Sequence, residues 1–363
     1  MVTIYVQGNL DLVGATHGIY VPATSTLTIE GIASTRATAE KFGNINVVAK
    51  EGSAIGGGNI TIQNIADLTA KAADYKHAFG IGATDATVVI KNTKIDYVAG
   101  GYIQPLFVND TQYGKNEPEG GAAIGGANIT IEDSEIVKAE GGSKAAAIGN
   151  RFHSNTNITI KNSTLGDIFG GNASAAIGGS RYSEDISADN KQTININIDN
   201  STITNAVGGQ FAAGIGAGYD THCKANDTNA VNHIVITNSN ITVKGGKHGA
   251  GIGTGYHSAA LTGSIDGEST INATAGESRE KYTLAQNIGY GVVDATREFK
   301  NANITFTVNG VVIPSPVAPS IHDNETYFCT SSIVHSPSSE QTVIQGPQHV
   351  EARSPIFYPA RCI

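Results

Sequence analysis

Short stretches in which apolar and polar residues alternate follow one another along most of the chain. Residues 128–131, 157–160 and 234–237 place Ile or Val at every second position. A period of two predicts half-buried β-strands, because successive side chains of a strand point to opposite faces. The same alternation excludes helical repeats, and we therefore expect an all-β protein.

An Ile-Gly pair, usually preceded by small residues, recurs eight times. The pairs begin at Ile55, Ile81, Ile124, Ile148, Ile177, Ile215, Ile252 and Ile288. The interval from Ile124 to Ile148 is 24 residues (148 − 124), which leaves room for three strands of ~4–6 residues and three turns. A propeller blade needs ~40 residues or more, and the Leu and Asn signature of leucine-rich repeats is missing.

These units predict a right-handed parallel β-helix, a solenoid with three strands per coil. No single unit can bury its apolar face, whereas stacked units bury a continuous column of Ile, Val and Ala. We place N-terminal coils at residues 1–50, the Ile-Gly repeats at 51–312 and an irregular tail rich in Pro and Ser at 313–363.

Polar and glycine residues mark the expected corners of each coil. Asn162, Asn200 and Asn238 follow a strand, and Asn tolerates the left-handed backbone of a tight corner; stacked Asn side chains are expected to form a ladder there. The glycine pairs at 141–142, 170–171, 208–209 and 245–246 are expected to supply positive φ at a second corner.

The unequal intervals between Ile-Gly pairs indicate insertions. Extra residues fall mainly at 178–191, 216–232 and 253–264, and a further insertion at 102–120 precedes an Ile-Gly pair. Insertions at equivalent places of a solenoid project from one side, which is often the binding face.

An aromatic residue follows the Ile-Gly pair in most of the later repeats, and His or acidic residues lie beside most of them. The aromatic residues are Phe152, Tyr182, Tyr219, Tyr256 and Tyr290, and the His residues beside them are His153, His222 and His257. Successive coils lie ~4.8 Å apart, so these aromatic residues are expected to form one stripe. Such a stripe suits a polysaccharide or glycan partner, whose sugar rings stack on aromatic faces. The alternative is that the rings cover the base of their own loops.

Three carboxylates near this stripe suggest an enzymatic alternative. Glu184 or Asp185, facing Asp220 from an adjacent coil, would provide the acid and base of a glycoside hydrolase. A polysaccharide lyase would instead use His222, His257 or Tyr219 as its base. A third alternative is a structural stalk of a surface protein, which needs no site.

Cofactor and cysteine patterns are weak. We predict no bound cofactor, although Asp110, Asp185, Asp189 and Asp220 could contribute to a calcium site. The three cysteines, Cys223, Cys329 and Cys362, are too few and too widely spaced to predict a zinc site or a disulfide framework. A Cys329–Cys362 bridge and free thiols both remain open.

Charge and hydropathy limit the partners and the location. The net charge is −9, only 15% of residues are charged, and no basic stripe runs along the chain, so we expect no nucleic-acid partner. No apolar run is long enough to cross a membrane, and no secretory signal is visible. Because the chain begins in mid-pattern, we expect an extracellular or cell-surface location as part of a larger protein.

Residues 122–131 carry a family resemblance. They read Ala-Ala-Ile-Gly-Gly-Ala-Asn-Ile-Thr-Ile, which resembles the glycine-rich β-helical repeats of large microbial surface and adhesin-like proteins. The resemblance covers about residues 50–310 and implies an extracellular setting with carbohydrate or host-surface contact. Polysaccharide lyases and glycosidases share the general fold, but none of their catalytic motifs matches this chain, so the fold alone transfers no activity.

Overall fold

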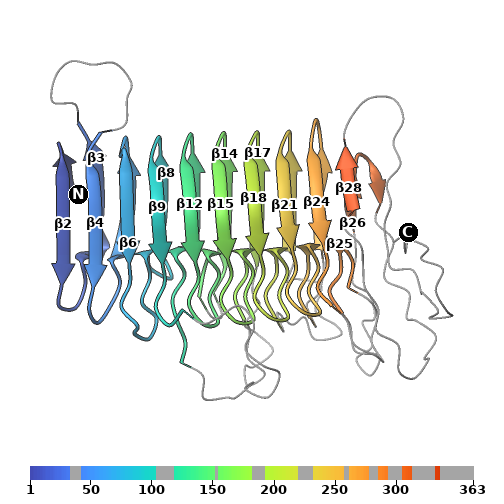
Figure 1. The fold of residues 1–363 in the computed structure, drawn as a ribbon, viewed down its shortest axis with the longest axis horizontal. Helices are drawn as coiled ribbons and strands as arrows, with labels where there is room; N and C mark the ends of the chain where they lie inside the picture. Colours follow the sequence, from blue (N-terminus) through green and yellow to red (C-terminus); the bar gives the residue numbers. More distant parts are fainter. Residues whose placement is uncertain are drawn as a thin grey trace, which may run out of the picture.

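The protein is all-β wherever its structure is described. The computed structural model describes residues 1–32, 42–103, 118–151, 154–181, 193–219, 232–256, 261–277, 285–292, 305–312 and 332–335. No helix occurs within these ranges. Strands stack side by side along one long axis, with the N-terminal repeats at one end and the last repeats at the other (Figure 1). This parallel, repeating arrangement is compatible with a β-helix.

Two sheets contain the described strands. The larger sheet has 18 strands, in which short Ile-Gly strands alternate with longer ones. They are β1 (Val2–Val6), β3 (Ile19–Gly31), β5 (Ile55–Gln63), β7 (Ile81–Gly82), β8 (Thr87–Lys91), β10 (Ile124–Gly125), β11 (Asn128–Glu132), β13 (Ile148–Gly149), β14 (Thr156–Lys161), β16 (Ile177–Gly178), β17 (Ile194–Asp199), β19 (Ile215–Gly216), β20 (Asn232–Thr237), β22 (Ile252–Gly253), β23 (Leu261–Asp266), β25 (Ile288–Gly289), β26 (Thr305–Val308) and β27 (Val311–Val312).

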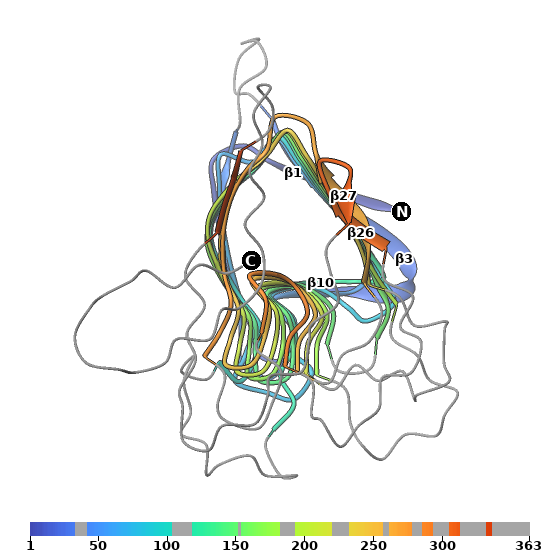
Figure 2. The ribbon, with the colours of Figure 1, turned by 90° about the vertical axis from the view of Figure 1, so that its right-hand side faces the viewer.

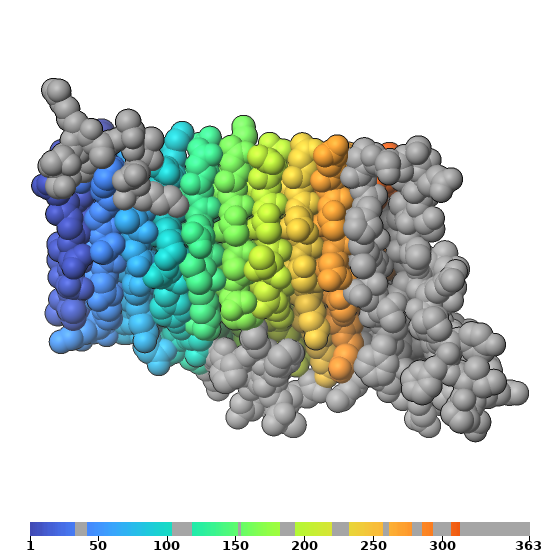
Figure 3. Space-filling view, turned by 45° about the horizontal axis from the view of Figure 1, so that its top comes forward, coloured from blue at the N-terminus to red at the C-terminus, as the bar shows by residue number. Residues whose placement is uncertain are grey.

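The second sheet has ten strands. They are β2 (Asn9–Gly14), β4 (Asn44–Ala49), β6 (Asp67–Lys71), β9 (Lys94–Ala99), β12 (Glu135–Glu140), β15 (Thr164–Phe169), β18 (Thr202–Val207), β21 (Asn240–Lys244), β24 (Thr270–Thr274) and β28 (Ser332–His335). Figure 2, which looks along the long axis, shows this sheet meeting the longer strands of the first sheet at an apex, with the short Ile-Gly strands closing the third side. In Figure 3 the described repeats form adjoining bands on the surface.

Strand pairing places like residues over like residues. Ile124 pairs in parallel with Ile81 in the preceding repeat and with Ile148 in the following one. The longer strands follow the same rule, since Ile129 pairs with Ile158 and is 1% exposed. The predicted columns of apolar side chains are thus confirmed and form one continuous core. Burying such columns is what stabilises stacked repeats.

The Asn corners are confirmed as left-handed and laddered. The φ angles of Asn162, Asn200 and Asn238 are 49°, 46° and 50°. Asn162 donates through Nδ2 to Asp133 Oδ1 over 3.1 Å, and Asn200 donates to Asn162 Oδ1 over 2.9 Å. The side chains of Asn162 and Asn200 therefore both permit the corner and bond the repeat before it.

A buried hydroxyl column lies directly after these corners. The Ser163 hydroxyl accepts the Ser134 backbone N–H over 3.1 Å and donates to the Lys161 carbonyl over 2.7 Å. Ser201 repeats the first contact by accepting the N–H of Ser163 over 3.1 Å. This column satisfies backbone groups that the corner leaves without strand partners.

The glycine pairs were predicted to supply positive φ at a corner, and this predicted reason was wrong. Neither glycine of any pair has a φ in the left-handed region. The requirement is space: a Cβ on Gly171 would lie 1.7 Å from the Gly142 carbonyl oxygen, and one on Gly209 would lie 1.9 Å from the Gly171 oxygen. Successive repeats approach so closely at this corner that only a hydrogen fits between them.

Candidate functional site

Most of the predicted site residues lie outside the described residues. They are Asp110, Phe152, His153, Tyr182, Glu184, Asp185, Asp189, Asp220, His222 and His257, together with the three cysteines. The acid and base pair and the calcium site therefore remain predictions. Within the described ranges, no group of three His, Cys, Asp or Glu residues is arranged to hold a metal ion, and no helix has the length and apolar character to cross a membrane.

Tyr219 and Tyr256 do lie together, as expected from their equivalent places in successive repeats. Each lies four residues after its Ile-Gly isoleucine. Their ring centroids are 5.7 Å apart and the planes differ by 7°, so the rings are stacked. Both side chains are partly exposed, and the two residues fall within the predicted insertions at 216–232 and 253–264.

Phe211 and His248 complete an aromatic cluster with these tyrosines, and sequence reasoning missed both. The two rings stack at 5.3 Å with planes 2° apart, and Phe211 lies 5.4 Å from Tyr219 and 5.5 Å from Tyr256. Each occupies the second position after a glycine pair, with φ of 67° and 66°. Aligning the repeats on Gly-Gly as well as on Ile-Gly would have brought them together.

Backbone hydrogen bonds hold the two columns of the cluster in register. The Tyr256 N–H donates to the Phe211 carbonyl over 2.8 Å, and the Tyr219 N–H donates to the Ala173 carbonyl over 2.9 Å. One repeat further on, the Val292 N–H donates to the His248 carbonyl over 2.8 Å. The stacked backbone thus positions every ring of the cluster.

Arg181 extends the tyrosine column into the preceding repeat. Its guanidinium carbon lies 5.6 Å from the centre of the Tyr219 ring. Tyr219 is therefore flanked by Arg181 from one repeat and by Tyr256 from the next.

Tyr290 does not join the cluster. Its side chain is 4% exposed and packs in the main core, and burial raises the pKa of its hydroxyl well above the usual value. It lies only two residues after Ile288, whereas Val292 occupies the place that Tyr256 has in its own repeat. The different spacing explains why an aromatic residue at this point turns inward.

A polar cluster, separate from the aromatic cluster, joins three repeats near the start of the Ile-Gly array. Arg151 donates through Nε to Thr84 Oγ1 over 2.7 Å, and its Nη1 lies 3.0 Å from His77 Nδ1. His77 Nε2 lies 3.6 Å from Glu119 Oε2. Burial and the nearby Arg151 charge lower the pKa of His77, and Glu119 opposes them. These contacts connect residues from separate repeats through their side chains.

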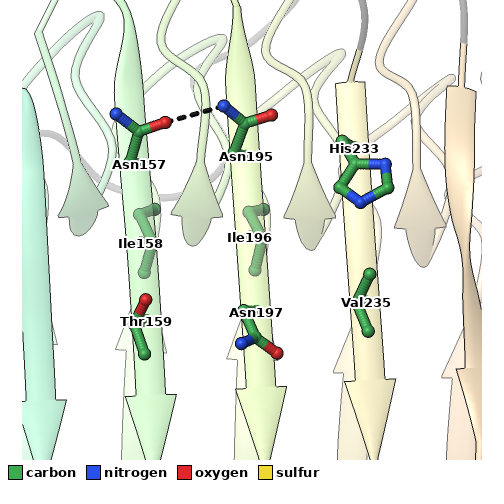
Figure 4. A pocket seen from close by; sticks show the side chains of 8 residues that line it. All are labelled: Asn157, Ile158, Thr159, Asn195, Ile196, Asn197, His233 and Val235. Carbon is green, nitrogen blue, oxygen red and sulfur yellow. Dashed lines mark hydrogen bonds between the residues drawn. The ribbon is translucent and has the colours of Figure 1, made fainter.

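A shallow hollow of about 230 Å³ lies on the outer face of the larger sheet. Its lining comes from β14, β17 and β20 and consists of Asn157, Ile158, Thr159, Asn195, Ile196, Asn197, His233 and Val235. Figure 4 shows two rows of side chains across these strands, one of Asn157, Asn195 and His233 and one of Thr159, Asn197 and Val235. The register aligns the members of each row in successive repeats.

No model of a known protein family matches the chain, and no curated protein or solved structure matches it either. A functional conclusion therefore depends on the surface chemistry of this protein alone.

Proposed function

We propose that the protein is a right-handed parallel β-helix with three strands per coil that binds carbohydrate without catalysis. The proposed surface is the aromatic cluster with Arg181, beside the insertions. The observation that supports this proposal is the stacked pair of Tyr219 and Tyr256, whose centroids are 5.7 Å apart. It brings tyrosine rings from separate repeats to one place on the surface.

The geometry favours contacts to ring edges and polar groups over stacking on open ring faces. Tyrosine hydroxyls both donate and accept hydrogen bonds, and a guanidinium provides several donors; together they match the hydroxyl groups of a sugar. Tyr219 and Tyr256 are held by the rings around them, so little side-chain freedom is lost on binding.

The proposed setting is extracellular, on a microbial surface or adhesin-like protein. Neutral and weakly charged sugar polymers are compatible with a chain in which only 15% of residues are charged. A β-helix of this kind would present its binding side along the length of the solenoid, so several sugar units of one chain could be contacted at once.

The test is retention on a glycan array by the wild type and by the double variant Tyr219→Phe, Tyr256→Phe. The rings and their stacking are preserved in this variant, whereas both hydroxyl groups are lost. We expect retention to fall by about tenfold, since each lost hydrogen bond contributes ~0.5–1.5 kcal/mol. Tyr5→Phe, at a tyrosine that is 62% exposed on the first repeat, is the matched control and should leave retention unchanged.

The same array separates binding from catalysis. Unchanged retention by the double variant would assign the rings a purely structural role at the base of the insertions. An assay of reducing ends and unsaturated products on the retained glycans tests the enzymatic alternative. Product formation that Asp220→Asn abolishes would replace the proposal of a non-catalytic module.

A further inference from the structure

We infer that the hollow on β14, β17 and β20 is a separate binding site for a neutral saccharide. None of its lining residues belongs to the aromatic cluster, so the inference does not depend on the proposed function. The argument uses the charge of the lining, the pairing of the backbone and the hydrogen-bonding groups that the side chains offer.

The lining contains no Asp, Glu, Lys or Arg. A charged ligand would lose part of its hydration in the hollow and find no counter-charge there. Amide, hydroxyl and imidazole groups instead exchange hydrogen bonds with neutral polar groups. The lining therefore favours an uncharged ligand over an acidic glycan, a nucleic acid or a charged peptide.

The backbone of the three strands is already paired. β17 lies between β14 and β20, with which it forms uninterrupted parallel ladders over residues 194–199. A peptide that binds by adding a strand needs an unpaired sheet edge, which this face does not provide. Recognition must therefore come from the side chains that point outward.

The asparagine side chains form a fixed array of donors and acceptors. Asn195 donates through Nδ2 to Asn157 Oδ1 over 2.7 Å, and Asn157 donates to Asn128 Oδ1 over 2.9 Å. An amide has two N–H donors and two acceptor lone pairs, and this ladder uses one donor of Asn195. Among the described residues, neither Asn195 Oδ1 nor the Asn197 side chain has a hydrogen-bond partner.

Asn195 and Asn197 therefore present donor and acceptor pairs at two successive outward positions of one strand, ~7 Å apart. Adjacent hydroxyl groups of a sugar ring each donate and accept, and so match such pairs. Val235 and the ring of His233 adjoin them in the next repeat and supply apolar surface for the C–H groups of the sugar. The combination identifies a saccharide with vicinal hydroxyl groups as the ligand class.

The experiment titrates the full chain with neutral gluco-, manno- and galacto-oligosaccharides while NMR records the asparagine side-chain amide resonances. We expect at least one series to shift the resonances of Asn195 and Asn197. The double variant Asn197→Ala, His233→Ala should weaken that binding by about tenfold, because it removes the hydrogen bonds of the Asn197 amide and the apolar surface of the His233 ring. Thr130→Ala is the control, because Thr130 pairs with Thr159 in the adjacent strand but does not line the hollow.

Each outcome decides the inference. Failure of every neutral series to shift these resonances overturns it, as does a double variant that binds as well as the wild type. The Tyr219→Phe, Tyr256→Phe variant should bind these oligosaccharides at the hollow normally. If that variant loses all saccharide binding and the hollow variant loses none, the aromatic cluster is the site and the hollow is not.

Discussion

One residue in each repeat sets the sharp corner between the two sheets. Asn162 adopts a φ of 49°, a conformation that costs most residues ~1–2 kcal/mol. Its side chain also bonds Asp133, and Asn200 in turn bonds Asn162. Backbone tolerance and cross-repeat bonding therefore act through the same side chain.

Replacing Asn162 should separate these two contributions. We expect Asn162→Ala to lower the free energy of unfolding by about 1–3 kcal/mol, because it combines the backbone cost with the loss of two ladder bonds. Asn162→Gly removes the same bonds but relieves the backbone, so it should be the milder change. Urea unfolding of both variants measures the difference; equal losses would mean that the left-handed corner contributes nothing.

His77 should make stability depend on pH. Burial and the Arg151 charge lower its pKa in the folded protein below the usual ~6.5. At a pH between the folded and the unfolded pKa of His77, the unfolded chain binds more protons than the folded protein. The contribution of His77 to the free energy of unfolding is therefore complete above the unfolded pKa, and it is lost as the pH falls through the folded pKa.

The test compares the wild type with His77→Asn, since Asn also tolerates the left-handed φ of 58° found here. Between pH 7.5 and 5.5 the wild type should lose more of its unfolding free energy than the variant. Parallel curves for the two proteins would show that His77 does not titrate differently on folding.

At the scale of the elements, close approach between neighbouring repeats most strongly limits which residues each position can accept. A Cβ at Gly171 would lie 1.7 Å from a backbone oxygen of the preceding repeat, and the stacked backbones cannot move apart without breaking their ladders. Similar limits apply to the Ile-Gly strands, where a Cβ on Gly216 would lie 1.9 Å from the Gly253 oxygen.

Gly171→Ala is therefore expected to destabilise the protein by about 4 kcal/mol or more or to prevent folding. Gly52→Ala is the graded control, because the nearest atom to its added Cβ is the Thr16 oxygen at 2.8 Å. Thermal unfolding, or soluble yield where Gly171→Ala does not fold, should rank the variants in this order. Equal stability of the two would show that the corner can open.

The strands and their order were predictable because each repeats its own spacing. Ile-Gly and Asn-Ile-Thr-Ile recur with enough regularity to align Ile124 with Ile148 before any pairing is known. The first strand of the Ile-Gly column was not predicted. Its isoleucine, Ile19, pairs with Ile55 but is followed by Tyr20 instead of glycine. The glycine pairs were recognised as corner residues, but the predicted reason, a positive φ, was wrong, because close approach between repeats cannot be inferred from a local sequence pattern.

The candidate site was predictable only where spacing is conserved between repeats within this chain. Tyr219 and Tyr256 share one offset from their isoleucines and lie side by side in successive repeats. Tyr290 has a different offset and is buried, and the amide hollow has no motif, since it arises from side chains 38 residues apart along the chain such as Asn157 and Asn195. Both cases require the register between repeats, which residue spacing alone does not provide.

At the scale of the whole molecule, each repeat is stabilised by its two neighbours, so the ends of the array differ from its middle. Among the described strands, β1 pairs only with β3 and β2 only with β4. Leu10 and Leu12 in β2 are partly buried, whereas Leu165 in β15 and Ile203 in β18 are at most 1% exposed. At the other end β27 and β28 pair in antiparallel fashion with β26 and β24.

Local unfolding of the repeats should therefore begin at the N-terminal end and spread along the array, as expected when stability is a sum of nearest-neighbour interfaces. Hydrogen exchange followed by mass spectrometry should show the least protection in β2 and β4 and the greatest in β15 and β18.

Leu12→Ala should then raise exchange in β2 and β4 while leaving β18 unchanged, because the lost contacts are confined to the first repeats. Ile203→Ala should raise exchange across the central repeats, because both of its neighbours lose packing. Uniform protection from β2 to β18, or a response to Leu12→Ala that reaches β18, would mean that the array unfolds as one cooperative unit.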